Sequence, residues 1–232
     1  MRLTRHLDAS FDRLAAAVPA TIGAAVALPD LTYSLGRWSC GVAWSTIKVP
    51  LAIAALRRDP VRARNLVVRA VTESDNPASE RLWSQLGEPA DAARQVQAVV
   101  SEAGDTVTVV ESRRLRPGFT AFGQTRWALA DQARFAAHLP QLRDAAGVVD
   151  LMRQLVAGQR WGLAAKGVAA KGGWGPAAAD GYLVRQFGSV PTDSGHLGVA
   201  VAAEAATFDT GVAALNAVAE WLFERMPQLA QQ

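Results

Sequence analysis

The chain of 232 residues is long enough to bury a sizeable core, and its composition, half hydrophobic and 19% charged, is typical of a soluble globular protein. Its formal charge is only +3, and no dense basic run alternates with aromatic residues, which argues against a nucleic-acid partner. The single cysteine, Cys40, excludes an internal disulfide and a cysteine zinc site, and no run of about 18 apolar residues predicts a membrane span.

The first part of the chain predicts a helix followed by a β-hairpin. Apolar residues recur at helical spacing over 4–17 and predict an amphipathic helix. The residues before this pattern lack the apolar core of a signal peptide, so either the protein stays in the cytoplasm or its export signal lies outside this sequence. Two β-favouring runs, 20–28 and 31–35, flank a turn at Pro29-Asp30.

The middle of the chain predicts helices. An apolar run from Ser45 to Leu56 suits a buried helix, and we expect Cys40 to be a small buried residue beside it. Residues 104–124 contain Pro and Gly without a regular period, which is typical of an irregular loop. Thr125 is expected to cap the next helix. The other helical patterns cover 61–71, 78–86, 90–102, 127–139 and 147–157.

The last third returns to strands. Three extended segments and one long apolar-faced helix are predicted, over 168–174, 182–188, 197–203 and 209–225. Because strands come from both ends of the chain, we expect an α+β fold with an antiparallel sheet of about five strands, covered by the terminal helices. The domain would be single, over 1–232, with an α/β lobe (1–40 and 161–232), an inserted all-helical lobe (41–160) and a cleft between them.

Ser45 and Lys48 form the first chemical motif. They are three positions apart at the head of the predicted helix, so the hydroxyl and the amine share a face, near the free N–H groups of the first turn. The chain has 24 basic residues, but only Lys48, Lys166 and Lys171 are lysine. Lysine can lose its proton when it is desolvated, whereas arginine cannot, so a neutral Lys48 could accept the proton of Ser45. A surface lysine beside a helix-capping serine is the alternative.

Two further motifs follow in order. Ser74-Asp75-Asn76 lies in a loop between helices, and Lys171-Gly172-Gly173 lies on a strand. Taken alone, each has an ordinary structural explanation, such as a polar loop that caps a helix. Together the three motifs resemble the serine β-lactamase and penicillin-binding-protein superfamily, and most of all its class A β-lactamases. The resemblance spans essentially the whole chain, from the N-terminal helix to the C-terminal one.

The resemblance implies a role for each matching residue. Ser45 would be the acylated nucleophile and Lys48 its proton acceptor. Ser74 would pass the proton to the leaving nitrogen, and Lys171 would polarise that hydroxyl. Asn76 would hold Lys48 and the substrate amide. The oxyanion would lie between the backbone N–H groups of Ser45 and of Trp174, the residue after Gly173.

The chain also departs from this family. Gly172 stands where the family usually has Thr or Ser, so a hydroxyl that binds the substrate carboxylate is missing, and Arg185 on the next strand is the candidate replacement. Class A enzymes use a loop glutamate to activate the deacylating water. Glu111 is the candidate here, with an ion pair to a neighbouring arginine as the alternative. Gln124 could also face the cleft.

These observations predict a serine hydrolase that forms an acyl-enzyme on Ser45 with a β-lactam or related amide and releases it with water. A D-alanyl-D-alanine peptidase or penicillin-binding protein with slow deacylation is the alternative within the same chemistry. A non-catalytic module that binds cell-wall peptides is the alternative from another class. We expect a monomer that needs no cofactor or metal; family members are usually exported.

Overall fold

The computed structural model describes residues 2–28, 31–178, 180–193 and 195–229, with side chains from residue 6 to residue 226 of these ranges. Its centre is a five-stranded sheet in the order β2-β1-β7-β6-β5, and every neighbouring pair is antiparallel. This confirms the predicted fold class. The predicted turn at Pro29-Asp30 lies outside the described residues. The strands are β1 (Ala20–Leu28), β2 (Leu31–Gly36), β5 (Ala169–Pro176), β6 (Tyr182–Thr192) and β7 (Gly195–Ala205).

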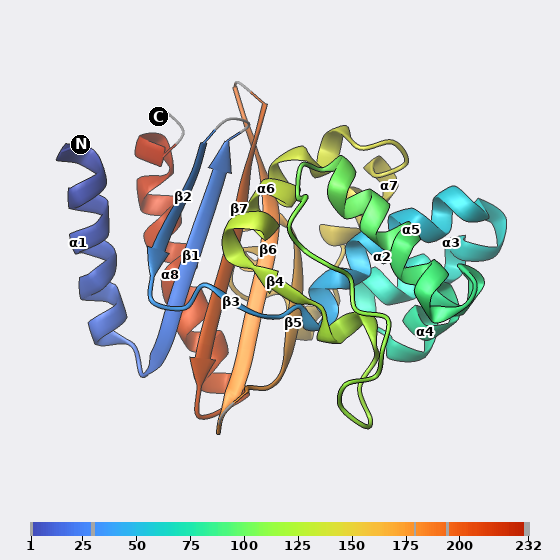
Figure 1. Cartoon of the computed structure of the whole chain (residues 1–232). Coiled ribbons are helices and arrows are strands. Elements are labelled where there is room, and N and C mark those ends of the chain that lie inside the picture. Colours follow the sequence, from blue (N-terminus) through green and yellow to red (C-terminus); the bar gives the residue numbers. More distant parts are fainter. Residues whose placement is uncertain (1, 29–30, 179, 194, 230–232) are drawn as a thin grey trace.

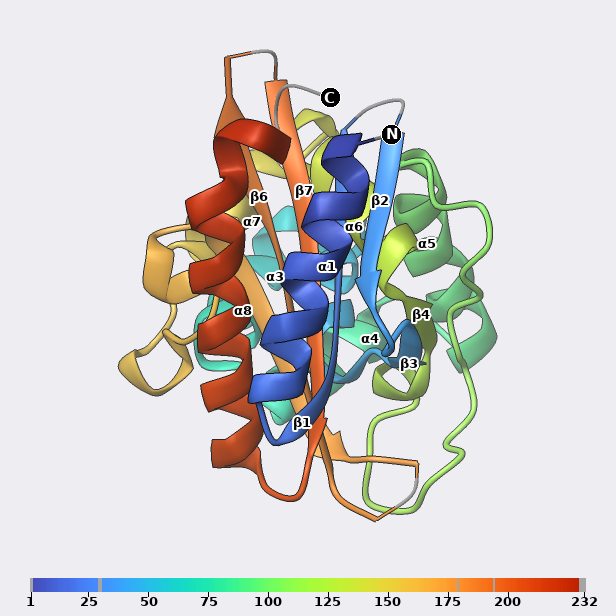
Figure 2. The same ribbon diagram turned by 90° about the vertical axis from the view of Figure 1, so that its left-hand side faces the viewer.

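The terminal helices α1 (Arg2–Ala17) and α8 (Phe208–Leu229) lie side by side on one face of the sheet (Figure 2). Their apolar stripes supply that side of the core, since Phe11 is fully buried and its ring meets Trp221 edge-on at 5.1 Å. The amphipathic pattern of the N-terminal segment is thus satisfied by packing on the sheet and on α8.

Helix α6 (Leu129–His138) packs on the opposite face, against β1 and β7. Gly198 permits this approach, because a Cβ there would lie 1.9 Å from the carbonyl oxygen of Ala133. A helix that the sequence pattern places in the helical lobe therefore contacts the sheet directly. The division of the chain into two lobes stays a prediction.

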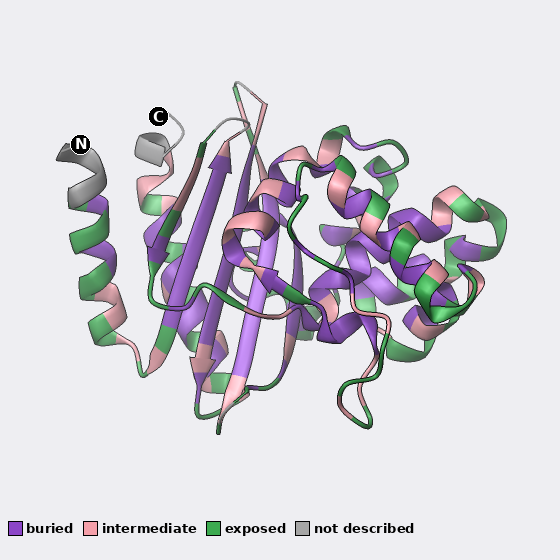
Figure 3. Ribbon diagram, viewed as in Figure 1, coloured by how far each residue is buried: buried purple, intermediate pink, exposed green. Residues whose placement is uncertain are grey.

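The other helices gather beside β5 (Figure 1). Helix α2 (Lys48–Arg58) is at their centre, and its residues Lys48 to Ala55 are all buried (Figure 3). Within the described ranges, no helix combines the length and apolar character needed to cross a membrane. The helices that surround α2 are α3 (Pro60–Val68), α4 (Asn76–Gln85), α5 (Pro89–Glu102) and α7 (Ala146–Met152).

Three local predictions are wrong. Thr125 does not cap a helix: strand β4 (Arg126–Ala128) follows it and pairs with β3 (Cys40–Val42), while the Thr125 hydroxyl accepts the backbone N–H of Glu111. Cys40 is exposed on β3 rather than buried. The predicted helix over 147–157 ends at Met152, and the chain continues into turns.

Candidate active site

Ser45 lies in a short 3-10 turn, Trp44–Ile47, that leads directly into α2. The turn is tight: Trp44 has a φ of 49°, which is uncommon for a residue with a side chain, and the Thr46 hydroxyl donates to Ala43 O at 2.6 Å. Ser45 itself is half-buried, and its hydroxyl makes no hydrogen bond to any described residue. A constrained turn therefore holds a serine whose hydroxyl has no hydrogen-bond partner among the described residues.

Lys48 is the first residue of α2, and its side chain is buried, with 1% exposure. Its Nζ donates to Ser74 O at 2.5 Å and to Asn76 Oδ1 at 2.7 Å, and a longer contact of 3.4 Å joins it to Ser74 Oγ. A neutral amine has two hydrogens and one lone pair. The two short bonds use both hydrogens and leave the lone pair free.

Ser74 is placed by an irregular end to a helix. A π-helical turn, Arg69–Glu73, follows α3, and Ser74 then adopts the left-handed conformation with a φ of 58°. Asp75 caps the next helix by accepting the backbone N–H of Ala78 at 2.6 Å and also forms an ion pair with Arg69. These contacts fix the Ser74 hydroxyl between the two lysines. Strained backbone of this kind is concentrated at functional sites.

Lys171 reaches the same hydroxyl from β5, the edge strand of the sheet. Its fully buried Nζ donates to Ser74 Oγ at 3.0 Å, to Gly172 O at 3.1 Å and to Gln159 Oε1 at 3.4 Å. The Ser74 oxygen thus accepts an N–H group from Lys171, and from Lys48 only when that amine carries its third hydrogen. Because a hydroxyl accepts two hydrogen bonds and donates one, Ser74 keeps its own hydrogen for another acceptor.

The two lysines have lowered pKa values. Burial lowers the pKa of Lys48 to about 7, while the nearby Asp75 carboxylate acts in the opposite direction. Burial and then the charge of Lys48 hold the pKa of Lys171 well below its usual range. The carboxyl pKa of Asp75 is itself lowered, first by the Ala78 N–H bond and further by Arg69. Burial is therefore the first cause of a partly neutral Lys48 at neutral pH.

Glycines on β5 let the strand approach its neighbours. A Cβ at Gly173 would lie 2.8 Å from Ser45 N, so this glycine lets the strand lie against the backbone of Ser45. A Cβ at Gly172 would lie 2.8 Å from the ring of Trp161, on the other face. Trp174 is half-buried, and its ring meets Trp161 edge-on at 6.2 Å.

Arg185, the predicted anchor for a substrate carboxylate, has its terminal guanidinium nitrogens engaged within the protein. Its side chain is fully buried on the sheet face that carries Gly173, and burial lowers its pKa to about 9. The guanidinium donates at 2.8–3.0 Å to four acceptors, and its carbon lies 5.3 Å from the ring centroid of Trp38. Both terminal nitrogens are therefore occupied. The acceptors are Gly41 O, Val42 O, Trp127 O and Gln132 Oε1.

Glu111 forms an ion pair with a neighbouring arginine, which was the alternative to its role as a base. Its carboxylate accepts from Arg113 Nε at 3.1 Å and from Arg113 N at 2.8 Å, and these contacts lower the pKa of the carboxyl. The side chain of Gln124 is buried in a turn that packs against the Ser45 turn. Gln124 donates to Thr120 O at 3.0 Å, while its Oε1 has no hydrogen-bond partner among the described residues.

Two residues that contact the candidate site carry no signal in the sequence. Gln159, which contacts Lys171, lies in a turn without helical or strand periodicity, so no pattern marks it. Gln132 links Arg185 to the Ser45 turn through the Thr46 hydroxyl, to which it donates at 3.0 Å. Its position inside a helix gives no sign of that role. Among the residues whose placement is described, no cluster of three or more His, Cys, Asp or Glu side chains could hold a metal ion.

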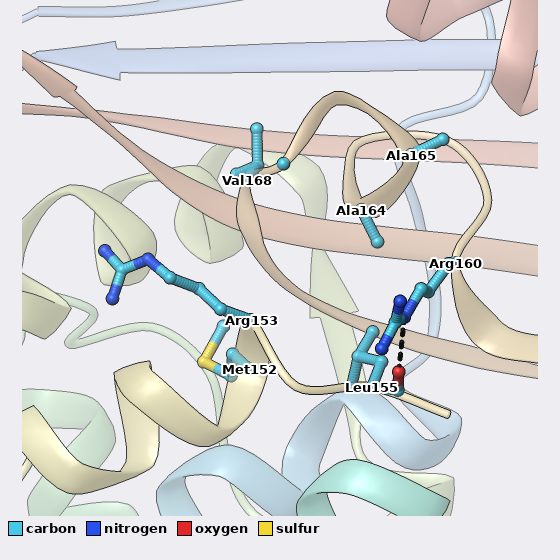
Figure 4. A pocket seen from close by; sticks show the side chains of 8 residues that line it. Met152, Arg153, Leu155, Arg160, Ala164, Ala165 and Val168 are labelled. Carbon is cyan, nitrogen blue, oxygen red and sulfur yellow. Dashed lines mark hydrogen bonds between the residues drawn. The ribbon is translucent and has the colours of Figure 1, made fainter. Parts of the chain in front are cut away.

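A separate cavity of about 420 Å³ lies between α7 and the start of β5 (Figure 4). It is lined by apolar side chains and by Arg153 and Arg160. None of the lysines or serines described above lines it. We therefore place the candidate active site at the Ser45–Lys48–Ser74–Lys171 cluster and not in this cavity.

Comparison with known proteins agrees with this geometry at the level of the fold. No protein-family model matches the sequence, and no curated protein is significantly similar to it. Among solved structures, PBP-A superposes with a TM-score of 0.72 at 20% identity, over 96% of each chain. A β-lactamase from Xanthomonas campestris gives 0.69 at 18% identity, over 96% of this chain and 98% of that one. A β-lactamase from Sphaerobacter thermophilus gives 0.69 at 19% identity, over 95% and 97%. The chain therefore has the fold of the serine β-lactamases and penicillin-binding proteins.

Proposed function

We propose that this protein is a serine acyl hydrolase that forms an acyl-enzyme on Ser45 with β-lactams or related amides. The observation that supports this most directly is the environment of Lys48. Its amine is buried, its pKa is about 7, and its two short hydrogen bonds leave the lone pair of the neutral amine free. An amine in that state is a competent general base at neutral pH.

In the proposed acylation, the Ser45 hydroxyl gives its proton to Lys48 Nζ, and the serine oxygen bonds to the carbonyl carbon of the substrate. The negative charge on the carbonyl oxygen is stabilised by the N–H groups of Ser45 and Trp174. Ser74 then donates its hydrogen to the leaving nitrogen and takes a proton from Lys48. The carbon–nitrogen bond breaks, and an ester remains on Ser45. Asn76 holds the Lys48 amine and Lys171 holds the Ser74 hydroxyl, the two groups that transfer the proton.

In the proposed deacylation, water cleaves the ester, releases the acid and restores the Ser45 hydroxyl. Glu111 is the predicted activator of this water, but its carboxylate is held by Arg113. That pairing favours the second candidate function, a D-alanyl-D-alanine peptidase or penicillin-binding protein whose acyl-enzyme turns over slowly. Gly172 has no hydroxyl to bind a substrate carboxylate, and it motivates the third candidate, a module that binds cell-wall peptides without turnover.

One experiment separates the three. The protein is mixed with a fluorescent penicillin, and its intact mass is followed over time, with Ser45→Ala as the test variant and the exposed Ser34→Ala as the matched control. A mass increase of one penicillin that is lost in Ser45→Ala and retained in Ser34→Ala supports acylation. Rapid loss of the adduct indicates a hydrolase, and a persistent adduct indicates the slow enzyme. If no adduct and no hydrolysed product are found, acylation is contradicted and the non-catalytic binding module remains.

A further inference from the structure

Gln159 is a buried polar residue with no role in the proposed mechanism. This residue ends a short turn, Ala157–Gln159, between α7 and β5, and it is buried, with 7% exposure. Its amide oxygen lies 3.4 Å from Lys171 Nζ. A buried glutamine beside a buried lysine requires an explanation, because both side chains give up hydration to be there.

The turn that carries Gln159 is fixed to the segment that carries Ser74. Val156 N donates to Thr72 O at 3.0 Å, in the π-helical turn just before Ser74. Arg160 Nε closes the turn by donating to Leu155 O at 2.6 Å, as the dashed line in Figure 4 shows. The segment 155–160 therefore joins the Ser74 turn to Lys171 on β5.

The contacts of Lys171 show what Gln159 contributes. An ammonium group has three hydrogens, and Nζ has three acceptors: Gln159 Oε1, Gly172 O and Ser74 Oγ. The bonds to Gln159 Oε1 and Gly172 O use two of the hydrogens, so the third points to Ser74 Oγ. All three are neutral, and no carboxylate of the described residues pairs with Lys171.

Apart from Lys48, the charged groups on the elements around Lys171 either interact with other residues or are exposed. Lys48 faces the same hydroxyl, and it lowers the pKa of Lys171. Asp75 pairs with Arg69, and Asp150 of α7 pairs with Arg153. The remaining charged groups on the adjoining elements are the exposed Glu73, the Arg160 that donates to Leu155, the buried Arg185 and the Lys166 that pairs with Glu220.

We propose that Gln159 is a positioning residue of the proposed reaction: its neutral oxygen orients the Lys171 ammonium toward Ser74 Oγ without supplying a negative charge. The inference rests on the proposed function, in which Ser74 passes a proton to the leaving nitrogen. A hydrophobic residue at 159 would leave one buried N–H of Lys171 unsatisfied and free to turn. A glutamate would form an ion pair, which favours the ammonium and draws it away from Ser74.

Two substitutions test this role. Gln159→Met keeps the length of the side chain but removes the acceptor, and Gln159→Glu keeps the acceptor but adds a charge. Gln154→Met is the matched control, because Gln154 is an exposed glutamine that donates to Asp150 O on α7. The rate of acylation by fluorescent penicillin is measured between pH 5 and 10, and thermal unfolding reports on folding.

We expect Gln159→Met to slow acylation at least tenfold at saturating penicillin, with little change in the concentration for half-saturation. Gln159→Glu should move the alkaline limb of the pH profile upward by about one pH unit, a shift that a purely structural role would not produce. Wild-type rates and profiles in both variants would overturn the proposal. If Gln159→Met does not fold, Gln159→Glu decides alone.

A second measurement separates this proposal from the proposed function. Lysine carrying ¹³C at Cε gives only three side-chain signals in this chain, and Lys166 serves as a surface reference. The pKa of Lys171 should rise in Gln159→Glu and stay unchanged in Gln154→Met. That rise can be observed even if penicillin never acylates Ser45. An unchanged Lys171 titration in Gln159→Glu would contradict the contact itself.

Discussion

Replacing Gly173 by alanine tests whether the backbone of the Ser45 turn is held in place by β5. The new methyl group would lie 2.8 Å from both Ser45 N and Ala43 O and 3.0 Å from Thr46 N, whereas ordinary contact begins at 3.4 Å. The turn or the strand must therefore move by about 0.6 Å. All three atoms belong to the backbone, so no side chain can rotate away.

Two consequences follow. Overpacking of this kind costs about 1–3 kcal/mol of folding free energy. A shift of part of an ångström at Ser45 N misplaces a proposed oxyanion donor and should slow acylation by about tenfold to a hundredfold. Gly147→Ala is the control, because nothing lies within 4 Å of a Cβ there and the residue belongs to α7. This variant should acylate normally and be slightly more stable.

The assay combines urea unfolding with stopped-flow acylation by fluorescent penicillin for both alanine variants. We expect Gly173→Ala to lose both stability and acylation rate, while Gly147→Ala keeps its rate. A Gly173→Ala protein that acylates at the wild-type rate would contradict the proposal that this strand fixes the N–H group of Ser45.

Four further predictions concern single side chains. Lys48→Arg should lower the rate of acylation by about 10²–10⁴-fold, because arginine stays protonated. In stopped-flow assays the wild-type rate of acylation should rise with pH through about 7. Retained activity in the variant would contradict the role of Lys48. Since the folded-state pKa of Lys48 lies below the unfolded value, the unfolded state binds more protons between these values. Between pH 7 and pH 9 the free energy of unfolding in urea should therefore rise by about 2 kcal/mol more for the wild type than for Lys48→Met. A difference in unfolding free energy that does not change with pH would count against the lowered pKa. Arg185→Met should destabilise the fold by about 2–4 kcal/mol in urea, because four acceptors, two of them buried, lose their donor; a wild-type midpoint would show that they are satisfied otherwise. Glu111→Gln should leave adduct loss in the mass assay unchanged, because the carboxylate is held by Arg113, and slower loss would restore Glu111 as the base.

The sheet and most helices could be predicted because their apolar periods extend over many residues. The N-terminal amphipathic pattern and the two runs before Gly36 match α1, β1 and β2 closely. The pairing of β3 with β4 could not be predicted, since strands of three residues carry no period. Thr125 resembles a helix cap in sequence, but a tertiary contact to Glu111 uses its hydroxyl.

The candidate site was predicted where residue type alone restricts the chemistry. Lysine in an arginine-rich chain identifies Lys48 and Lys171, and both lie at Ser74. The buried contacts of Arg185 could not be predicted, because strand alternation does not reveal that strand β3 and helix α6 cover the guanidinium. Gln159 was missed because its role depends on a hydrogen bond between separate elements.

The proposed acylation depends most on a partly neutral Lys48, and the titration of this lysine can be measured directly. With only three lysines in the chain, ¹³Cε-lysine spectra recorded from pH 5 to 11 follow each amine separately, and Lys48→Arg identifies the signal of interest. We predict that Lys48 titrates with a pKa of about 7. A Lys48 signal that titrates at about 10 or higher would contradict the proposed general base.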